Sequence, residues 1–509
     1  MLLHTLLRQF DQNLSLSGLN DIEIGGVCED SRAARPGDLF IARPGTKTDG
    51  RQFVADAAAR GAVAAVVSRR LSECPIPQIV VADPAAAISP LAMACYEQPC
   101  KQVQTLAVTG TNGKTTTTYL IRHILTSIGR RCGMIGTVEI DDGRTRSSAT
   151  MTTPSAVEIA RLLASMRDRG CWTCAIEVSS HALDQGRVSG AQFAGAAFTN
   201  LTGDHLDYHK TMENYAAAKA KLFEMLDRNA VAVVNAYDPW SNRIVQNTHA
   251  RVIQFGIGRK GDYRAREVSV TAEGSSFMLR TPDGEAEVHT PLIGQHNIAN
   301  ALTAAALVGE VCGLSVHQIA SSLETATGAP GRLQPVRCGQ PFAVYVDYAH
   351  TDDGLKNVLR AVRPLVKNKL RVVFGCGGDR DRTKRPRMAR AAEKLADVIY
   401  VTSDNPRTEN PSAIIDEIIA GFSADIELSG ATRSVSKPRK SQQPKPVLVE
   451  PDRRLAIQRA LADAQPGDIV LLAGKGHENY QIIGTERKHF DDVEEASSFL
   501  QQHITTSAA

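Results

Sequence analysis

The sequence of 509 residues lacks the marks of an exported or membrane-spanning protein. No apolar run reaches the ~18 residues that a spanning helix needs. The N-terminus has no basic region of the kind that opens a signal peptide, and it already carries charge at Arg8. Neither sign of charge dominates, because 58 Lys and Arg stand against 55 Asp and Glu. This balance gives no reason to expect a nucleic acid or an anionic membrane as a partner. We therefore expect a cytoplasmic protein with no membrane insertion and no nucleic-acid ligand.

Cysteine is sparse as well, and no internal repeat of solenoid period is present. Most of the ten cysteines stand singly in apolar segments, as buried thiols of a reduced compartment do. Cys171 and Cys174 have the spacing of a redox or zinc half-site. Because no second pair accompanies them and Cys174 opens an apolar strand, a core position is the favoured interpretation, and a metal or redox role is the alternative.

The small basic excess of the chain is local. Five basic residues and no acidic one lie between Leu428 and Val449, so the remaining chain has 53 basic against 55 acidic residues. The stretch is rich in Ser, Pro, Lys and Gln, which is typical of an exposed loop. A nucleic-acid role for it is the alternative.

Apolar residues make up 43% of the chain, enough for several cores, and the length indicates about three domains. We place them at residues 1–101, 102–334 and 335–509. Near-continuous apolar strands alternate with helical patterns, so an α/β fold with parallel sheets covered on both faces is predicted. The predicted strands include 38–42, 62–67, 105–109, 174–178, 195–200, 230–235, 342–347, 370–374, 398–402 and 468–473, with a helix near 214–226.

A phosphate-binding loop is the strongest local signal. The strand at 105–109 runs into Gly110-Thr111-Asn112-Gly113-Lys114-Thr115-Thr116, and a helix follows. Backbone N–H groups and the helix N-terminus then face a phosphate chain, which Lys114 contacts at its β and γ oxygens. Thr115 is placed to bind Mg²⁺. The general pattern has one more glycine where Val108 stands, so this is a variant of the loop.

Magnesium needs further oxygen ligands. Glu177 ends an apolar strand, and strand ends line the ligand crevice of an open α/β sheet. The segment 200–209 follows another strand end and offers several polar side chains. Each could be a solvated loop residue on its own, but together with the phosphate loop they favour a metal–nucleotide site.

These motifs resemble those of the Mur ligases, the ATP-dependent amide-forming enzymes of peptidoglycan synthesis. The matching runs are 109–116, 177–183, 204–209 and 347–351. Further runs at 30–32, 152–154, 377–380, 404–407 and 474–478 narrow the resemblance to the branch that adds diaminopimelate. The resemblance runs in order from Asp30 to Asp492. Two departures are the basic stretch 428–449 and Tyr237, where an acidic residue is commoner.

The resemblance implies three α/β domains: an N-terminal UDP-binding module, a central P-loop ATPase-like parallel sheet and a C-terminal Rossmann-like domain. It implies that the γ-carboxylate of a UDP-muramoyl-dipeptide is activated by ATP as an acyl phosphate. The amine of meso-2,6-diaminopimelate then displaces the phosphate. ATP and Mg²⁺ are the cofactors that it implies, the partners are these small molecules, and we expect a monomer.

The resemblance also assigns residues, beginning with the nucleotide and metal. Lys114, Glu177, His205, Lys219 and His350 are the implied catalytic residues, and a buried core position is the alternative for His350. Thr115 and Glu177 are expected to bind Mg²⁺, and a second Mg²⁺ is expected near His205 and a carbamate of Lys219, although spacing alone does not choose between Lys219 and Lys221. ATP is expected to contact the loop residues Gly110 to Thr116 together with Asn297, Asn300, Arg332 and Asp347.

The UDP-linked substrate is expected to contact Ser31, Thr46, Lys47, Thr48, Thr152, Thr153, Ser179, Gln185 and Arg187. Diaminopimelate is expected to contact Arg380, Asp404, Asn405, Pro406, Arg407, Gly474 and Glu478. The planar guanidinium of Arg407 suits the carboxylate that distinguishes this amino acid from lysine. The alternative is that 404–407 is merely a turn whose arginine is solvated.

Two rival functions follow from the same motifs. A folylpolyglutamate synthase shares the fold and the acyl-phosphate chemistry, but it is expected to have Gly where this chain has Thr115 and to lack the UDP module. A nucleotide-binding switch protein without catalysis would need neither Glu177, His205 nor Lys219. Hydrolysis of ATP that depends on both the UDP-linked peptide and the amine would exclude the switch protein.

Overall fold

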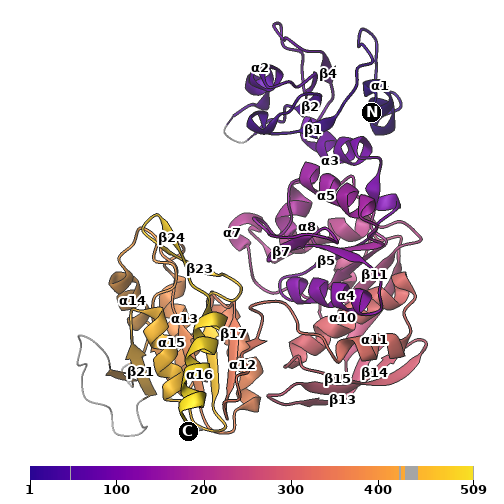
Figure 1. The fold of residues 1–509 in the computed structure, drawn as a ribbon. Coiled ribbons are helices and arrows are strands. Elements are labelled where there is room, and N and C mark those ends of the chain that lie inside the picture. Colours follow the sequence, from indigo (N-terminus) through magenta and orange to yellow (C-terminus); the bar gives the residue numbers. More distant parts are fainter. Residues whose placement is uncertain (46–47, 424–425, 430–444, 508–509) are drawn as a thin grey trace. The chain divides into compact units, whose positions relative to one another are not determined.

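The computed structural model describes residues 1–45, 48–423, 426–429 and 445–507 (Figure 1). The chain divides into two compact units. The first comprises Met1–Glu267, Phe277–Val288 and Ala299–Ala326, and the second comprises Val268–Ser276, His289–Ile298 and Thr327–Ala509. Within the described ranges no helix is both long and apolar enough to cross a membrane.

The N-terminal part of the first unit contains a parallel sheet in the order β1-β2-β3-β4. Side chains alternate along its strands: Leu39 and Ile41 pack into one apolar cluster, whereas Phe40 packs into another, so both faces are covered. Its elements are α1 (Leu3–Phe10), β1 (Gly26–Cys28), β2 (Asp38–Ile41), α2 (Val54–Ala59), β3 (Ala64–Val67), β4 (Gln78–Val80) and α3 (Pro84–Cys95).

The central sheet has the order β15-β14-β13-β12-β11-β10-β5-β9-β6-β7-β8. Strands β12, β11, β10, β5, β9 and β6 are parallel, and β7 and β8 extend the sheet in antiparallel fashion. Because β5 lies between β10 and β9, the turns that follow these three strands open at the same edge. The strands are β5 (Gln104–Thr109), β6 (Cys132–Ile135), β7 (Glu139–Asp141), β8 (Arg146–Ser148), β9 (Thr173–Glu177), β10 (Gly195–Phe198), β11 (Val231–Asn235), β12 (Arg251–Ile257), β13 (Tyr263–Val270), β14 (Ser275–Thr281) and β15 (Gly284–Thr290).

Helices connect these strands, and several begin at side-chain caps. Ser155 accepts a hydrogen bond from the N–H of Glu158, and Ser179 accepts one from the N–H of Ala182. The helices are α4 (Lys114–Ser127), α5 (Ala156–Asp168), α6 (Ser180–Asp184), α7 (Leu206–His209), α8 (Met212–Glu224), α9 (Ser241–Ile244), α10 (Gln295–Cys312) and α11 (Val316–Leu323). Short 3₁₀ helices lie at Ser31–Ala33, Gly50–Phe53, Pro99–Lys101 and Arg363–Leu365.

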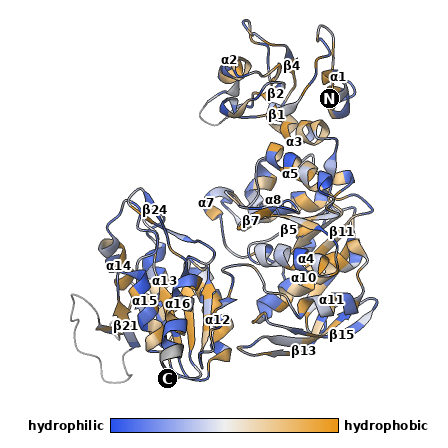
Figure 2. Ribbon diagram, viewed as in Figure 1, coloured by the Kyte–Doolittle hydropathy of each residue, from blue (hydrophilic) through white to orange (hydrophobic). Residues whose placement is uncertain are grey.

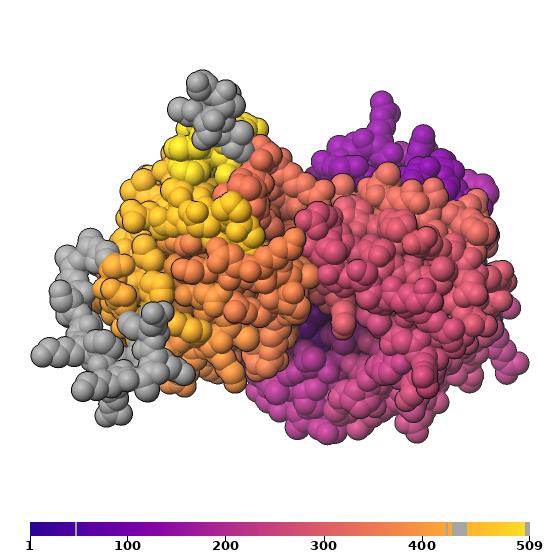
Figure 3. Space-filling model, turned by 90° about the horizontal axis from the view of Figure 1, so that it is seen from below, coloured from indigo at the N-terminus to yellow at the C-terminus, as the bar shows by residue number. Residues whose placement is uncertain are grey.

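The second unit contains a sheet in the order β16-β17-β22-β18-β19-β21-β20, parallel except for β16. In Figure 2 the apolar strands of this sheet lie between helices that carry both apolar and polar residues. In Figure 3 the first part of the unit (orange) adjoins the C-terminal part (yellow) on the surface. Its strands are β16 (Gln334–Pro335), β17 (Ala343–Asp347), β18 (Leu370–Phe374), β19 (Val398–Val401), β20 (Ile426–Ser429), β21 (Lys445–Val449) and β22 (Ile469–Ala473), with a hairpin of β23 (Tyr480–Ile483) and β24 (Glu486–His489). Its helices are α12 (Asp352–Val362), α13 (Lys384–Leu395), α14 (Pro411–Ile419), α15 (Arg453–Ala462) and α16 (Asp492–Ser507).

The α/β class, the parallel sheets and the predicted strands are confirmed, with ends that differ by a few residues. The prediction of an exposed loop from Leu428 to Val449 is wrong at both ends. Residues 445–449 form β21, which pairs with β19 and buries Val447, and 428–429 belong to β20. Arg433, Lys437, Arg439 and Lys440 of the basic stretch lie outside the described residues.

Candidate active site

The phosphate loop connects β5 to α4. Gly110 and Gly113 have φ values of +145° and +88°, and a Cβ at Gly110 would lie 1.9 Å from Oγ1 of Thr199. Only glycine fits this backbone and this approach. The ammonium of Lys114 donates to the carbonyls of Gly110 (2.9 Å) and Thr111 (3.0 Å). The lysine is therefore folded back over the loop, where the phosphate chain of a nucleotide would lie.

Glu177 lies at the end of the neighbouring strand β9 and is fully buried. Its Oε2 accepts hydrogen bonds from the hydroxyls of Thr115 (3.0 Å) and Thr137 (2.9 Å), and its Oε1 accepts one from the N–H of Thr137 (2.8 Å). The structure thus brings together the two predicted magnesium ligands, Thr115 and Glu177. The sequence analysis missed Thr137, which lies two residues after the end of β6 and has only that position as its signal.

Lys219 is 1% exposed, and its ammonium nitrogen donates to the carbonyl of Gly110 (3.0 Å). The nitrogen also lies 4.4 Å from the centroid of the Tyr215 ring, whose hydroxyl is 3.3 Å from Oγ1 of Thr111. Burial, and after it the charge of Lys114, holds the pKa of Lys219 well below its ordinary value. Lys221, by contrast, is exposed and pairs with Asp184 at 2.9 Å. The geometry favours Lys219 as the lysine of the site.

Aromatic rings surround His205 at the start of α7. The ring centroid of His181 lies 5.0 Å from that of His205, and Tyr215 lies 6.1 Å away. His209 joins the same group and is hydrogen-bonded through Nε2 to Oγ of Ser180 (2.9 Å). Burial lowers the pKa of His205, so the imidazole is more readily neutral and can act as a ligand.

The predicted peptide-binding residues form one hydrogen-bonded group. The hydroxyl of Thr153 donates to the carbonyl of Glu177 (2.8 Å) and accepts from the N–H of Ser179 (3.0 Å). Arg187 donates to the carbonyl of Thr153 (2.7 Å) and to the side-chain oxygen of Gln185 (2.7 Å). Thr152 joins the group through Thr137, since their hydroxyl oxygens are 3.1 Å apart.

The predicted UDP residues are described only in part. Ser31 is buried at the start of a 3₁₀ helix that Asp30 caps, and Thr48 is exposed. Thr46 and Lys47 lie outside the described residues.

The other predicted nucleotide residues lie at several places. Asn300, on α10, lies against the phosphate loop, because a Cβ at Gly113 would be 2.3 Å from its Oδ1. Asn297 donates to the carbonyl of Ile293 (3.0 Å).

In the second unit, the guanidinium of Arg332 lies 4.8 Å from the ring centroid of Tyr348, and this ring contacts His350. Asp347 ends β17 and accepts the N–H groups of Leu333 (2.8 Å) and Ala349 (2.9 Å). Nδ1 of His350 is 2.9 Å from the carbonyl oxygen of Tyr348, and the histidine is only partly buried.

The predicted diaminopimelate residues gather at the carboxyl ends of β19 and β22. Asn405 donates to Oε2 of Glu478 (2.9 Å), and Gly474 adopts a φ of +119° near Asp404. Arg407 donates to the carbonyl of Gly378 (2.8 Å), and Arg380 lies on the neighbouring loop and is exposed. Pro406 is buried. Arg407 lies near the carboxylate of Glu478, which is close to that of Asp404, and Arg380 lies beside Arg407 at Gly377, so both kinds of charge are present, as a ligand with both requires.

Lys475 is a second residue that the sequence analysis missed, although it stands inside one of the matched runs. It is fully buried and donates to Oδ1 of Asn405 (3.2 Å) and to the carbonyl of Tyr480 (2.6 Å). Its nitrogen lies 3.4 Å from Oδ1 of Asp404. Burial opposes the ionisation of Asp404, but Lys475 and Arg453 outweigh it and keep the pKa of this carboxyl below its ordinary value. Asp404 is thus held as an anion in the site.

Cys171 and Cys174 lie in the apolar core of the first unit. Cys171 and Cys174 are both buried and free, and burial raises the pKa of each thiol. In the described part of the chain, no group of three or more His, Cys, Asp or Glu side chains is arranged to hold a metal ion. The oxygens of Thr115 and Glu177 nevertheless suit Mg²⁺, which takes only one or two protein ligands and completes its shell with phosphates and water.

Family models match most of the chain. A Mur ligase family, catalytic domain model matches residues 23–96, a Mur ligase middle domain model matches 108–308, and a Mur ligase, glutamate ligase domain model matches 331–476.

Near full-length relatives share one name, UDP-N-acetylmuramoyl-L-alanyl-D-glutamate–2,6-diaminopimelate ligase. The protein from Gloeobacter violaceus is 45% identical over 505 residues, which are 99% of this chain and 98% of that protein. The protein from Thermosynechococcus vestitus is 44% identical over 95% of this chain and 94% of its own length. The protein from Geobacillus kaustophilus is 45% identical over 91% of this chain and 92% of its own length.

Solved structures agree with these matches. A structure with the same ligase name has a TM-score of 0.68 at 33% identity and covers 94% of this chain and 95% of its own. A folylpolyglutamate synthase from Mycobacterium tuberculosis has a TM-score of 0.60 at 19% identity, with 81% and 93% covered, and this likeness concerns the fold alone.

Proposed function

This chain belongs to the Mur ligase family, and on that premise we propose that it joins meso-2,6-diaminopimelate to UDP-N-acetylmuramoyl-L-alanyl-D-glutamate with conversion of ATP to ADP and phosphate. The observation that carries the proposal is the cluster of Lys114, Glu177 and the buried Lys219 around one phosphate loop. A binding protein without catalysis has no need to bury a lysine against that loop.

The reaction proceeds in two steps. The D-glutamate γ-carboxylate attacks the γ-phosphorus of ATP, so that a C–O–P bond forms and ADP leaves. The amine of diaminopimelate then attacks the acyl carbon, phosphate leaves, and the amine loses a proton as the amide forms. Lys114 neutralises charge on the phosphoryl oxygens as they pass from ATP to the substrate, and this positioning and neutralisation is most of what phosphoryl transfer needs.

Mg²⁺ fits the oxygens of Thr115 and Glu177, and when bound it supplies further neutralisation of the transferring phosphoryl group. A second Mg²⁺ site would be formed by His205 and the carbamate of Lys219. A free ammonium at Lys219 would repel the cation, whereas the carbamate made with CO₂ reverses the charge. The depressed pKa of Lys219 supports this assignment, because only the neutral amine reacts with CO₂.

The remaining contacts follow the three proposed domains, 1–101, 102–334 and 335–509. We assign the UDP moiety to Ser31 and the turn at 46–48, and the muramoyl-dipeptide to Thr152, Thr153, Ser179, Gln185 and Arg187. Asn297, Asn300, Arg332 and Asp347 contact the nucleotide, and His350 lies near the acyl phosphate. We further propose that the enzyme acts in the cytoplasm as a monomer.

The test is the mass of the product after incubation with ATP, UDP-muramoyl-dipeptide and an amino acid. Diaminopimelate should give the amide together with equimolar ADP and phosphate. Omission of either the UDP-linked peptide or the amine should abolish phosphate release. Release of phosphate without both substrates, or a product with lysine but none with diaminopimelate, would overturn the proposal.

A further inference from the structure

The loops that follow β18 and β19 carry the two arginines assigned to diaminopimelate. We call residues 375–383 the first arginine loop and residues 402–410 the second arginine loop. They touch through their backbones: the N–H of Gly378 donates to the carbonyl of Asn405 (2.9 Å), and a Cβ at Gly378 would lie 1.9 Å from the carbonyl oxygen of Pro406. The arginines converge at Gly377, where a Cβ would be 2.9 Å from Nη1 of Arg407 and 3.9 Å from Cγ of Arg380.

Both loops contain a non-glycine residue with a left-handed backbone. Asp379, which precedes Arg380, has a φ of +53°, and Arg407 itself has a φ of +52°. Such conformations are unfavourable for residues with a Cβ and persist only where surrounding contacts enforce them. The directions of the two arginine side chains therefore depend on whatever holds these two residues. The backbone of Arg407 is held by the β23–β24 hairpin, because its N–H donates to the carbonyl of Ile482 (3.0 Å) and its carbonyl accepts from the N–H of Gly484 (2.8 Å).

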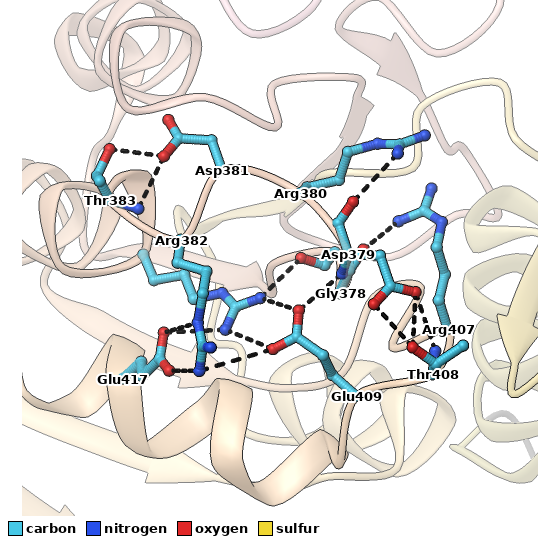
Figure 4. A network of polar contacts seen from close by, with 12 residues as sticks. Gly378, Asp379, Arg380, Asp381, Arg382, Thr383, Arg407, Thr408, Glu409 and Glu417 are labelled. Atoms are coloured by element: carbon cyan, nitrogen blue, oxygen red, sulfur yellow. Dashed lines mark hydrogen bonds and ion pairs between the residues drawn. The ribbon is translucent and has the colours of Figure 1, made fainter.

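Glu409 holds Asp379. Its Oε1 accepts a hydrogen bond from the N–H of Asp379 on the other loop (2.7 Å). The Asp379 carboxylate in turn accepts from the hydroxyl of Thr408 (2.8 Å). Behind Glu409, the fully buried guanidinium of Arg385 grips both carboxylate oxygens (2.8 and 3.0 Å). Figure 4 shows Glu409 beside Asp379 and Thr408, with the ends of Arg380 and Arg407 on the side away from Glu417.

We propose that Glu409, locked by Arg385, is a positioning residue that sets the selectivity of the enzyme for a diacid over lysine. It does so by holding Asp379, which precedes Arg380 and binds Thr408 beside Arg407, so that the two arginines keep a common direction towards one carboxylate. Bidentate binding of a carboxylate depends on the direction of the guanidinium plane, so a loosened loop loses this contact first. Lysine lacks this carboxylate, so loss of the contact should leave the affinity for lysine unchanged. The inference rests on the proposed function.

Glu417 provides a matched control. It lies on α14 and pairs with the same Arg385 (2.9 Å) and with the exposed Arg382, and among the described residues these two arginines, not Asp379 or Arg407, are its ion-pair partners. Glu409→Gln and Glu417→Gln therefore each remove one carboxylate from the same arginine, and each removes a contact to the first arginine loop, but only Glu409→Gln removes the contact to Asp379.

The experiment measures kcat and KM for diaminopimelate, lysine, ATP and the UDP-linked peptide with each variant. Glu409→Gln should raise the KM for diaminopimelate by about tenfold, because misplacement of a recognition group by a fraction of an ångström weakens its contact. The preference for diaminopimelate over lysine should fall by the same factor, and the KM values for ATP and the UDP-linked peptide should stay within about twofold of the unmodified enzyme. Glu417→Gln should leave the preference unchanged.

Several results would overturn the inference. One is an unchanged preference in Glu409→Gln, and another is an equal loss in both variants, which would indicate a merely structural role. A rise of all KM values together in Glu409→Gln would also overturn the inference, because it would indicate a general loss of structure. If Glu409→Gln does not fold, Thr408→Val removes the hydroxyl bound by Asp379 and should reduce the preference severalfold. An unmodified enzyme that joins neither amino acid overturns the proposed function instead.

Discussion

Lys219 is a residue whose environment conflicts with its ordinary charge, because it is buried against Gly110 and near Lys114. We predict that Lys219→Ala loses turnover by about 10²-fold or more, since a ligand that neutralises charge in the transition state is removed. The fold should survive, as judged by circular dichroism, and short carboxylates in the buffer should restore part of the activity. The exposed Lys221→Ala is the control and should be active. Full activity of Lys219→Ala would remove the residue from the site.

The same lysine predicts a pH dependence. Its pKa lies well below the ordinary 10.5, so the amine is neutral above that lowered value and cationic below it. Only the neutral amine attacks CO₂. Enzyme stripped of CO₂ should therefore be reactivated by bicarbonate, and the rate of reactivation should fall as the pH is lowered through the pKa of Lys219. Labelled bicarbonate should give a carbamate signal in NMR that is absent from Lys219→Ala. Reactivation that is equally fast at acidic pH would contradict the carbamate.

Lys114 is the other decisive residue of the phosphate loop. Lys114→Ala should reduce phosphate release by about 10²-fold or more, because a cation on the transferring phosphoryl group is deleted. Binding of the UDP-linked peptide, measured by calorimetry, should change little. Near-normal phosphate release would contradict the assignment of the loop.

At the scale of elements, the second arginine loop supports a prediction of substrate choice. In a competition between diaminopimelate and lysine, the unmodified enzyme should prefer the diacid by about two orders of magnitude, because lysine leaves Arg407 without its partner. Arg407→Ala should erase most of this preference and chiefly raise the KM for diaminopimelate. Product masses from one mixed reaction measure both effects. Equal incorporation of lysine by the unmodified enzyme would contradict the assignment of Arg407 to the carboxylate of diaminopimelate.

At the scale of the whole molecule, the two compact units should unfold as separate transitions in calorimetry. In the second unit, the first residues of α15 and α16, Arg453 and Asp492, form a fully buried ion pair (2.6 Å). Asp492→Asn leaves the arginine without its counter-ion and should cost about 3–5 kcal/mol. The midpoint temperature of the transition of the second unit should therefore fall by roughly 10 °C, while that of the first unit stays unchanged.

The control for that variant joins the same two helices. Arg454 and Glu495 pair at 2.7 Å with Arg454 half exposed, so Glu495→Gln should change stability by about 1 kcal/mol at most. A single transition that shifts as a whole in Asp492→Asn would show that the units do not unfold independently.

The sequence by itself determined the fold class, most strands and the motifs of the site. The reason is local: an apolar strand followed by Gly110–Thr116 specifies a phosphate loop in nearly any α/β context, and Glu177 is assigned by its place at a strand end. The runs at 404–407 and 474–478 likewise carry their chemistry in consecutive residues.

Tertiary structure decided what depends on residues far apart in the chain. It separated Lys219 from Lys221, because only the fold determines which lysine is buried against Gly110. It paired Thr137 with Glu177 and Lys475 with Asn405, and it made a strand of 445–449 because β19 offers an edge to pair with. It also placed Glu409 on Arg385 and Asp379. Burial and partner choice are properties of the packed chain, and no local pattern encodes them.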